Sequence, residues 1–553
     1  MIGSLIFVGA VAAAMPCESL KSISLPGTTI TAAELVAAGP YTPPPLGPPG
    51  GPVTVGRGPE SAAVAAGAQA PATAGRGAAA GAQAPAAGRG GRGDQPPPAP
   101  PLMLPAHCRV NAILRPSPDS EIEMELWMPA EDWNGKFEAV GNGGWAGVIS
   151  YAAMASALRE GYATASTDTG HKGGNALFAI GHPEKLVDFA YRAVHEMTLK
   201  SKALVSAFYD RGPRLSYWNG CSTGGRQGLM EAQKYPDDFD AILAGAPANY
   251  QTHLHLWDLS VAVPALKDPA AAVPAAKLAM LNKAVVEACD AHDGVKDGLL
   301  NDPRSCHFDP STLLCKGADG DTCLTPPQVE SVKRMYSAVK TRSGEAVFPG
   351  KDPGSETGWN VISGGSQPPG VSVGSFQVAY NDANWDWKTF DLDRDLKAVD
   401  KKVGSTINAI NPDLSAFKAR GGKLLLYHGW NDTAISAGNT VNYYSSVLAK
   451  MGPKQDNFVR LFMAPGMQHC GNGPGPNQVN YMGALERWRE ANVAPDQLIA
   501  SHVTNNRVDM TRPLCPYPQL AQYKGAGSTN DAANFVCKAP AKAAEAQTSV
   551  SRK

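Results

Sequence analysis

One serine in this chain lies between two glycines, in a setting that would make its hydroxyl a nucleophile. Gly220-Cys221-Ser222-Thr223-Gly224 matches G-x-S-x-G, in which the glycines leave room for a sharp strand-to-helix turn that exposes the serine. The apolar run Leu215–Trp218 precedes it and a plausible helix follows, which is the context that the pattern needs. Gly370-Val371-Ser372-Val373-Gly374 also matches, but the Gly- and Pro-rich residues before it cannot form a strand. Ser222 is therefore the predicted nucleophile.

A serine hydroxyl needs a neighbouring base to remove its proton, and the base is held by an acid. In chains with this turn the acid and then the histidine come later, each in a loop after a strand. Asp432 follows the strand pattern of Lys423–His428, and His469 lies in the loop after Val459–Met463. His428 is the competing base, but it lies on the strand itself, where a packed, hydrogen-bonded role fits better.

Two cysteines flank two of these residues. Cys221 is next to Ser222, and Cys470 is next to His469. A disulfide between them would hold their Cα atoms within roughly 4.4–6.8 Å and bring the serine and histidine loops together. The alternative is a pair of buried free thiols.

A serine nucleophile of this kind also needs two backbone N–H donors for the oxyanion. One is expected from the residue after the nucleophile, Thr223, and the other from an early strand–helix loop. Gly141-Asn142-Gly143-Gly144 is the evident source of the second. We expect the amide of Gly144, with that of Gly143 as the alternative.

Alternating strand and helix patterns position these residues. Apolar runs predict strands at 108–114, 122–128, 137–140, 162–167, 215–219, 241–244, 423–428 and 459–463. Helical spacing predicts helices over 184–209 and 224–234, and a last helix carrying Met482, Leu485 and Trp488. The alternation predicts the α/β class, with a mainly parallel sheet covered on both faces. It stops between about 249 and 420, which we interpret as an inserted lid domain.

The chain divides into seven expected segments. Residues 40–105 are almost entirely Pro, Gly, Ala and Arg, a composition that predicts disorder because it cannot bury enough apolar area. Leu5–Ala14 is typical of a signal-peptide core, although the positive start is missing; a buried N-terminal segment is the alternative. The expected division is a signal peptide (1–16), an N-terminal segment (17–39), the disordered insertion (40–105), a first core part (106–248), the lid (249–420), a second core part (421–540) and a disordered tail (541–553).

The charge balance, the hydropathy and the cysteine content argue against several classes of protein. The chain has 553 residues, with 49 Lys and Arg against 50 Asp and Glu, so it lacks the basic excess of a dedicated nucleic-acid binder. No apolar run reaches 18 residues, so no transmembrane helix is expected. Ten cysteines and the apolar start predict disulfides and a secreted or periplasmic protein. The lack of a C-x-x-C pair argues against a zinc ribbon.

Five segments carry a resemblance to a known family. They are Gly141-Asn-Gly-Gly-Trp-Ala-Gly147, Tyr191-Arg-Ala-Val-His-Glu-Met197, Gly220-Cys-Ser-Thr-Gly-Gly-Arg-Gln-Gly228, His428-Gly-Trp-Asn-Asp432 and Gly466-Met-Gln-His-Cys470. Together, across about Cys108–Cys537, they resemble the tannase and feruloyl esterase family of α/β-hydrolases, which includes mono(2-hydroxyethyl) terephthalate hydrolases. The resemblance implies an α/β-hydrolase fold, a Ser222–His469–Asp432 triad above a Cys221–Cys470 bond, and a lid that shapes the acyl pocket.

The resemblance also implies a calcium loop in the lid. Cys289–Leu299 places Asp290, Asp293 and Asp297 among glycines, and such carboxylates can wrap a hard cation with the carbonyls of Val295 and Leu299. His292 is not an expected ligand, because calcium prefers oxygen. The implied cofactor is structural Ca²⁺, with no organic cofactor. The further disulfides implied are Cys289–Cys306, Cys315–Cys323, Cys515–Cys537 and Cys17–Cys108, the last left in doubt by the inserted tract.

The function implied is a secreted serine carboxylesterase acting on esters of aromatic, hydroxycinnamic acids. Its substrate would be a small aromatic ester, free or attached to plant polysaccharide or polyphenol, with no nucleic-acid partner. Tannase-like or terephthalate-monoester activity on the same triad is the alternative, and a non-catalytic binding protein on a hydrolase scaffold is a further one. Trp385, Trp387 and Phe390 are expected either to line an aromatic acyl pocket or to pack as lid core.

Overall fold

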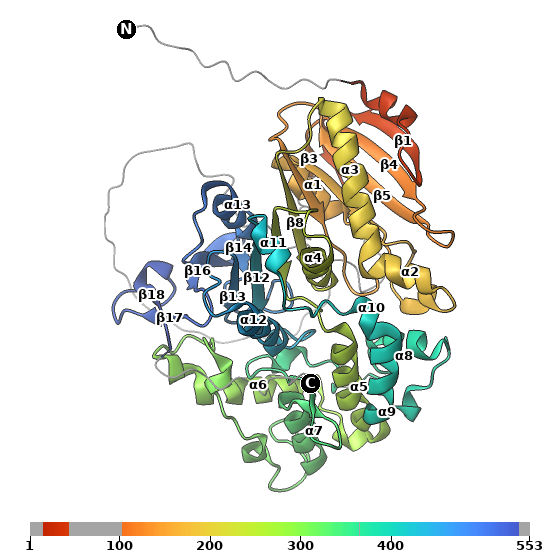
Figure 1. Ribbon diagram of the computed structural model, residues 1–553. Helices are drawn as coiled ribbons and strands as arrows, with labels where there is room; N and C mark the ends of the chain where they lie inside the picture. The colour runs from red at the N-terminus through yellow and green to blue at the C-terminus, as the bar shows by residue number, and fades with distance from the viewer. Residues whose placement is uncertain (1–14, 44–101, 364, 541–553) are drawn as a thin grey trace, which may run out of the picture.

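The computed structural model describes residues 15–43, 102–363 and 365–540 (Figure 1). The predicted signal peptide, apart from its last residues, the tail 541–553 and most of the tract 40–105 lie outside the described residues. The two ends of that tract are described, and they differ from the expectation of disorder throughout. There, β2 (Gly39–Tyr41) pairs antiparallel with β3 (Leu102–Leu104).

The core of the molecule is a mixed, mainly parallel sheet of nine strands. Their order is β1-β4-β5-β7-β6-β8-β9-β12-β13. β1, β4 and β5 run antiparallel to their neighbours, whereas the strands from β7 to β13 pair in parallel. The bounds are β1 (Thr28–Val36), β4 (His107–Leu114), β5 (Ile122–Pro129), β6 (Lys136–Val140), β7 (Ala163–Thr167), β8 (Leu215–Cys221), β9 (Ala241–Gly245), β12 (Lys423–Gly429) and β13 (Val459–Ala464).

Helices cover both faces of this sheet, and the central strands are therefore buried on both sides. One apolar cluster joins the sheet to α3 (Ala193–Tyr209), α4 (Thr223–Lys234), α11 (Ser415–Ala419) and α12 (Ala437–Met451). A second joins the other face to α1 (Tyr151–Arg159) and α13 (Tyr481–Ala491). The α/β class expected from the strand–helix alternation is thus confirmed.

Residues 249–420 contribute helices but no strand to the main sheet. Their buried apolar side chains fall mainly into two further clusters, one of which also includes Trp145 and Phe189, and they lie at one end of the sheet (Figure 1). Their longer helices are α5 (Gln251–Lys267), α6 (Ala275–Cys289), α7 (Pro326–Tyr336), α8 (Gly370–Tyr380) and α9 (Leu392–Val399), with a two-stranded sheet of β10 (Val339–Lys340) and β11 (Ala346–Phe348) and the short α10 (Ser405–Ile407). We refer to this segment as the lid.

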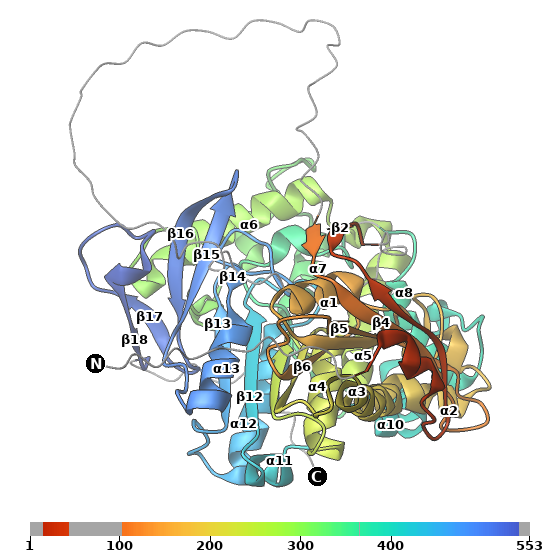
Figure 2. The same cartoon turned by 90° about the horizontal axis from the view of Figure 1, so that it is seen from above.

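Three features differ from the sequence patterns. The helix expected over 184–209 consists of α2 (Pro183–Val187), a π-helical turn (Asp188–Arg192) and α3. The sequence does not predict β1, because its side chains are exposed or half-buried except for Ile30 and show no apolar alternation. After β13 come β14 (Gln478–Val479) and, beyond α13, β15 (Leu498–Thr504), β16 (Arg507–Leu514), β17 (Leu520–Tyr523) and β18 (Phe535–Lys538), on the side of the molecule away from β1 (Figure 2). No helix among the described residues is long and apolar enough to cross a bilayer.

Candidate active site

The turn between β8 and α4 holds Ser222 in a strained conformation. Its φ of 63° and ψ of −122° lie outside the regions that L-residues favour. The two neighbouring chain segments pass so close that a Cβ on Gly220 would lie 2.5 Å from the backbone of Gly224. A Cβ on Gly225 would lie 2.4 Å from the carbonyl oxygen of Gly245, to which the amide of Ser222 donates at 3.0 Å. The glycines of the motif therefore allow the turn that puts this hydroxyl at the carboxyl end of the sheet.

Asp432 and His469 follow β12 and β13, which pair in parallel and so end at the same edge. The Nδ1–H of His469 donates to Oδ2 of Asp432 at 2.7 Å. Two backbone amides, of Ala434 and Ile435, each donate to Oδ1 of Asp432 at 2.8 Å. The structure thus brings together the predicted acid and base. Because the proton of the neutral imidazole is on Nδ1, Nε2 of His469 is the nitrogen that can accept a proton.

His428 contacts the same carboxylate from the strand. Its Nε2 lies 2.9 Å from Oδ2 of Asp432 and 3.2 Å from the carbonyl oxygen of Ile435. Two acceptors at one nitrogen require that Nε2 carries the proton, so Nδ1 accepts the hydroxyl of Thr440 at 2.7 Å. His428 is fully buried, and it packs as a hydrogen-bonded support, as its strand position indicated.

Burial by itself would raise the pKa of the Asp432 carboxyl. The rings of His469 and His428, by charge and hydrogen bonding, outweigh that effect and hold the pKa well below its usual range. The carboxylate therefore stays ionised throughout the pH range in which an imidazole titrates.

A disulfide joins the serine turn to the histidine loop. Cys221 and Cys470 are bonded, with their Cα atoms 6.0 Å apart across a sequence separation of 249 residues. Since each cysteine is adjacent to one site residue, the bond fixes the turn of Ser222 beside the loop of His469. The other bonds are Cys17–Cys108, Cys289–Cys306, Cys315–Cys323 and Cys515–Cys537, the pairs that the resemblance implied, and no cysteine of the described residues is free.

The loop after β6 lies against the start of α4. The hydroxyl of Thr223 donates to the carbonyl oxygen of Gly144 at 2.8 Å, and the amide of Gly224 donates to the carbonyl oxygen of Asn142 at 2.8 Å. Thr223 is the first residue of α4, where an amide has no carbonyl of its own helix to bind. Gly144 has a φ of 53°, which glycine adopts without strain. These contacts hold the loop of Gly144 against the residues that follow Ser222.

Gln227 positions this loop, and no sequence signal singled it out. Its Oε1 accepts the amide of Asn142 at 3.1 Å, and its Nε2 donates to Oδ1 of Asn142 at 3.0 Å. The Asn142 amide group donates in turn to the carbonyl oxygens of Val148 and Thr167. The motif G-C-S-T-G-G-R-Q-G contains Gln227, but only the folded chain shows that it reaches a residue 85 positions away.

A hydrogen bond joins α8 of the lid to the loop after β6. The indole Nε1–H of Trp145, in the loop after β6, donates to the carbonyl oxygen of Val371 at 2.8 Å. Ser372, the second serine in a G-x-S-x-G pattern, is buried inside α8 and donates to Asp258 at 2.6 Å, so it is not on a turn. Trp385, Trp387 and Phe390 pack on the apolar cluster of α8 and α9. All three side chains are only partly buried.

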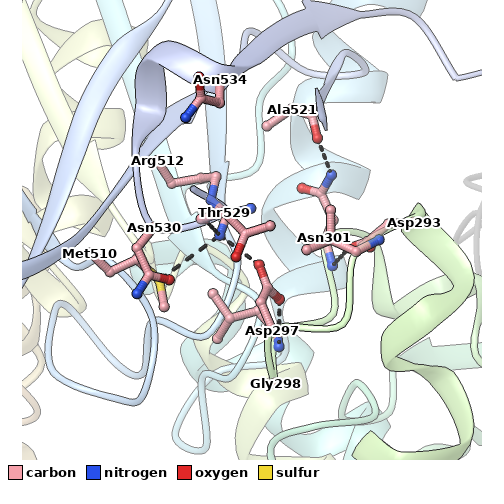
Figure 3. A network of polar contacts seen from close by, with 12 residues as sticks. Asp293, Asp297, Gly298, Asn301, Met510, Arg512, Ala521, Thr529, Asn530 and Asn534 are labelled. Carbon is pink, nitrogen blue, oxygen red and sulfur yellow. Dashed lines mark hydrogen bonds and ion pairs between the residues drawn. The ribbon is translucent and has the colours of Figure 1, made fainter. Parts of the chain in front are cut away.

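The predicted calcium loop follows α6. Asp290 accepts the amides of Asp297 and Gly298, and Asp293 accepts those of Val295 and Asn301. Asp297 accepts the amide of Leu299 and bonds Arg512 of β16 at 2.6 Å (Figure 3). The side chain of Asn301 donates to the carbonyl oxygen of Ala521 at 2.8 Å, so the loop is fastened to the C-terminal strands.

The oxygen ligands of this loop suit a hard cation, although the three carboxylates do not converge on a single position. Three carboxylates stand within eight residues, and Arg512 is the one cation paired with them among the described residues. The excess negative charge is what a divalent ion would balance. The three carboxylates do not form a group whose oxygens all lie within 4.8 Å of one another. Binding would therefore require them to turn inward.

Two other clusters have metal-ligand spacing. Cys315, Asp319 and Cys323 form one, but both sulfurs are in a disulfide and offer no thiolate. His195 of α3, Glu231 of α4 and Asp238 form the other, in which Nδ1 of His195 lies 2.6 Å from Oδ2 of Asp238. The ammonium of Lys202 donates to the carbonyl oxygen of Asp238, so a cation is already in place there.

Known proteins resemble this chain over most of its length. The profile of the family described as "Tannase and feruloyl esterase" matches residues 108–538. An uncharacterized esterase of Xanthomonas campestris pv. campestris is 38% identical over 493 residues, which span 78% of this chain and 84% of that protein. A probable feruloyl esterase B-2 of Aspergillus terreus is 35% identical over 455 residues, spanning 78% of this chain and 86% of the relative.

Solved structures show the same fold. The crystal structure of feruloyl esterase B from Aspergillus oryzae superposes with a TM-score of 0.80 at 30% identity, covering 94% of this chain and 99% of that one. Tannin acyl hydrolase from Aspergillus niger superposes with a TM-score of 0.72 at 21% identity, covering 96% of each chain. The resemblance noted in the sequence is confirmed: the chain belongs to the tannase and feruloyl esterase family and is a carboxylic ester hydrolase with the α/β-hydrolase fold.

Proposed function

We propose that this chain is a secreted serine esterase that cleaves esters of feruloyl-type aromatic acids through an acyl-enzyme. The observation that carries the proposal is the hydrogen bond of 2.7 Å between His469 and Asp432, in a loop tied by the Cys221–Cys470 bond to the turn of Ser222. The substrate class is supported by the names of the relatives, two of which are feruloyl esterases B at 35% and 30% identity.

The reaction would run in two halves. In the first, Nε2 of His469 takes the proton of Ser222 as its oxygen attacks the ester carbonyl, and the amides of Gly144 and Thr223 receive the oxyanion. His469 then gives the proton to the leaving alkoxide, which leaves the acyl group on Ser222. In the second half water attacks the acyl-enzyme with His469 again as base. Asp432 holds the imidazole tautomer and stabilises its protonated form.

The calcium ion is part of this proposal. The carboxylates of Asp290, Asp293 and Asp297, with the carbonyls of Val295 and Leu299, would hold it, and the excess of negative charge in the loop supports a divalent cation. When bound, the ion would neutralise these carboxylates and fix the loop. It would have no part in the chemistry at Ser222.

Secretion is supported by the disulfides. All ten cysteines are paired, and disulfides persist in oxidising compartments. An ester attached to plant polysaccharide or polyphenol would be met outside the cell, which agrees with this location.

A panel of esters tests the function. Purified protein, supplied with calcium, would be assayed on methyl ferulate, methyl gallate and mono(2-hydroxyethyl) terephthalate at equal concentrations. We expect the highest kcat/KM on methyl ferulate. A higher value on the gallate or on the terephthalate ester would reassign the acyl group, and no hydrolysis of any ester would contradict the proposal.

A further inference from the structure

The lid contains a buried lysine whose amine has no hydrogen-bond partner among the described residues. Lys351 is 1% exposed, and its Nζ is among the buried atoms left without a partner. The amine lies 5.0 Å from the ring centroid of Trp257, within cation–π distance. Lys277, another buried lid lysine, is paired instead with Asp319 and with Oε1 of Gln328 at 2.8 Å. A buried ammonium without hydrogen bonds needs nearby negative charge.

Asp432, whose carboxylate stays ionised, supplies that charge, and two further carboxyl groups act on the same amine. Asp432 of the candidate triad, Asp258 of α5 and Asp352, the next residue along the chain, all act electrostatically on Lys351. Asp258 accepts the hydroxyl of Ser372, whereas Oδ2 of Asp352 is also left without a hydrogen bond. Around them, Arg304 and Asp302 form their own ion pair at 2.6 Å beside Asp352, and His428 and His469 face Asp432.

The segment that carries Lys351 packs directly on the loop of Asp432. The amide of Lys351 is anchored in the lid, where it donates to the carbonyl oxygen of Met335 at 2.7 Å. Three residues on, the carbonyl oxygen of Gly354 accepts the side-chain amide of Asn431 at 2.6 Å. A Cβ on Gly358 would lie 2.4 Å from the side chain of Thr433. Residues 351–358 and 431–433 are thus packed without room between them.

We propose that Lys351 is a positioning residue of the ester-cleaving site: its buried ammonium, placed by the lid, balances the charge of Asp432 and opposes a positive charge on His469. The proposal rests on the serine-esterase function proposed above. Burial lowers the pKa of Lys351, while Asp432, Asp258 and Asp352 oppose that shift. With the ammonium in place, a proton on His469 meets an opposing positive charge that a neutral side chain at position 351 would not supply.

The pH dependence of kcat/KM on methyl ferulate tests this role, because its acid limb reports protonation of the free enzyme's essential base. Lys351→Met and Lys351→Gln remove the charge, and we expect the acid limb to move to higher pH by about half a unit or more. The same substitutions would also raise the pKa of Asp258 and of Asp352, since each carboxyl group loses a neighbouring cation. Lys351→Arg keeps the charge and should restore the wild-type limb.

The matched control is Lys277→Met, which removes a buried lid lysine that is paired with Asp319 and Gln328 and should leave the acid limb in place. An unchanged limb in folded Lys351→Met overturns the proposal, and so does an equal shift in Lys277→Met. Both neutral variants could fail to fold, as judged by near-UV circular dichroism. In that case Asp258→Asn tests the same charge effect by removing a negative charge near Lys351 instead of the positive one. It should move the limb to lower pH, and no shift would overturn the proposal.

The two proposals fail in different ways. A wild-type protein that hydrolyses no ester rejects the serine-esterase function. A wild-type protein that hydrolyses methyl ferulate, is inactivated by Ser222→Ala and keeps its acid limb in Lys351→Met rejects only the role of Lys351.

Discussion

His428 and His469 both donate to Oδ2 of Asp432, at 2.9 and 2.7 Å, from two different strand ends. One carboxylate oxygen thereby holds the candidate base and a second imidazole that is fully buried. The second imidazole fixes the direction in which Asp432 presents its oxygen to His469. The second imidazole, that of His428, lies on the strand that precedes Asp432, only four positions earlier in the chain.

His428→Ala should lower kcat on methyl ferulate by about tenfold to 100-fold, with a smaller change in KM. The reason is that Asp432 loses one of its donors and no longer holds the His469 tautomer in one orientation. Steady-state kinetics measure the effect. His502→Ala, which removes an imidazole paired with Asp509 on the C-terminal hairpin, is the control and should keep wild-type kcat. Wild-type kcat in His428→Ala would show that Asp432 needs no second support.

Replacing both Cys221 and Cys470 by Ser should lower kcat by about tenfold to 100-fold, since small misplacements of reacting groups cost that much. It should also lower the free energy of unfolding by about 2–5 kcal/mol, as is typical of a lost native disulfide. The control is the double serine variant of Cys315 and Cys323, a bond that spans only 8 residues within the lid. Equal losses of kcat in both variants would contradict a specific link between the serine turn and the histidine loop.

Removal of calcium should lower Tm. Chelation leaves the three loop carboxylates uncompensated except by Arg512, and the loop contacts the C-terminal strands through Asp297 and Asn301 (Figure 3). Differential scanning fluorimetry with EGTA and with added CaCl₂ measures the effect. Asp293→Asn should abolish the rise in Tm on adding calcium, whereas Asp309→Asn, at an exposed lid turn, should keep it. A Tm that does not respond to either addition contradicts calcium binding.

Stability should fall as the pH rises through about 7, in part because of Asp352. Burial raises the pKa of this carboxyl to about 7, against the opposing charge of Arg304. Since the folded state binds this proton more tightly than the unfolded chain, the stabilisation is fully present below the unfolded pKa of about 4 and is lost above the folded pKa.

Tm measured between pH 5 and pH 8.5 tests this sign. Asp352→Asn should decline less than the wild type over that range. Asp496→Asn, at a side chain that is 92% exposed, should follow the wild type. An equal fall of Tm with pH in the wild type and in Asp352→Asn would show that this carboxyl keeps an ordinary affinity for its proton.

Much of the fold and the order of the candidate site residues could be predicted, because their signals are local. The strand at 215–219 and the glycines around Ser222 lie within ten residues, and the apolar strands before Asp432 and His469 are equally compact. β1 could not be predicted, since it is an edge strand with a single buried side chain and its pairing with β4 depends on residues about 80 positions away.

The supporting contacts of the site were beyond sequence reasoning. Gln227 reaches Asn142, and the lid segment of Lys351 reaches the loop of Asp432, only after strands and helices distant in the chain have packed together. A buried lysine also has no sequence signature of its own, because the same residue type is usually exposed. Local patterns therefore identified the reacting groups, and the folded chain identified what holds them.

The most direct measurement of the central claim is the turnover of methyl ferulate by Ser222→Ala beside the wild type. The account predicts a loss of about 10⁴-fold or more in kcat, with near-UV circular dichroism unchanged, because the neighbouring hydroxyl, that of Thr223, is bound to the carbonyl oxygen of Gly144. Ser372→Ala, the other serine in a G-x-S-x-G pattern, should keep wild-type kcat. Retained cleavage by folded Ser222→Ala would contradict the claim that Ser222 is the nucleophile.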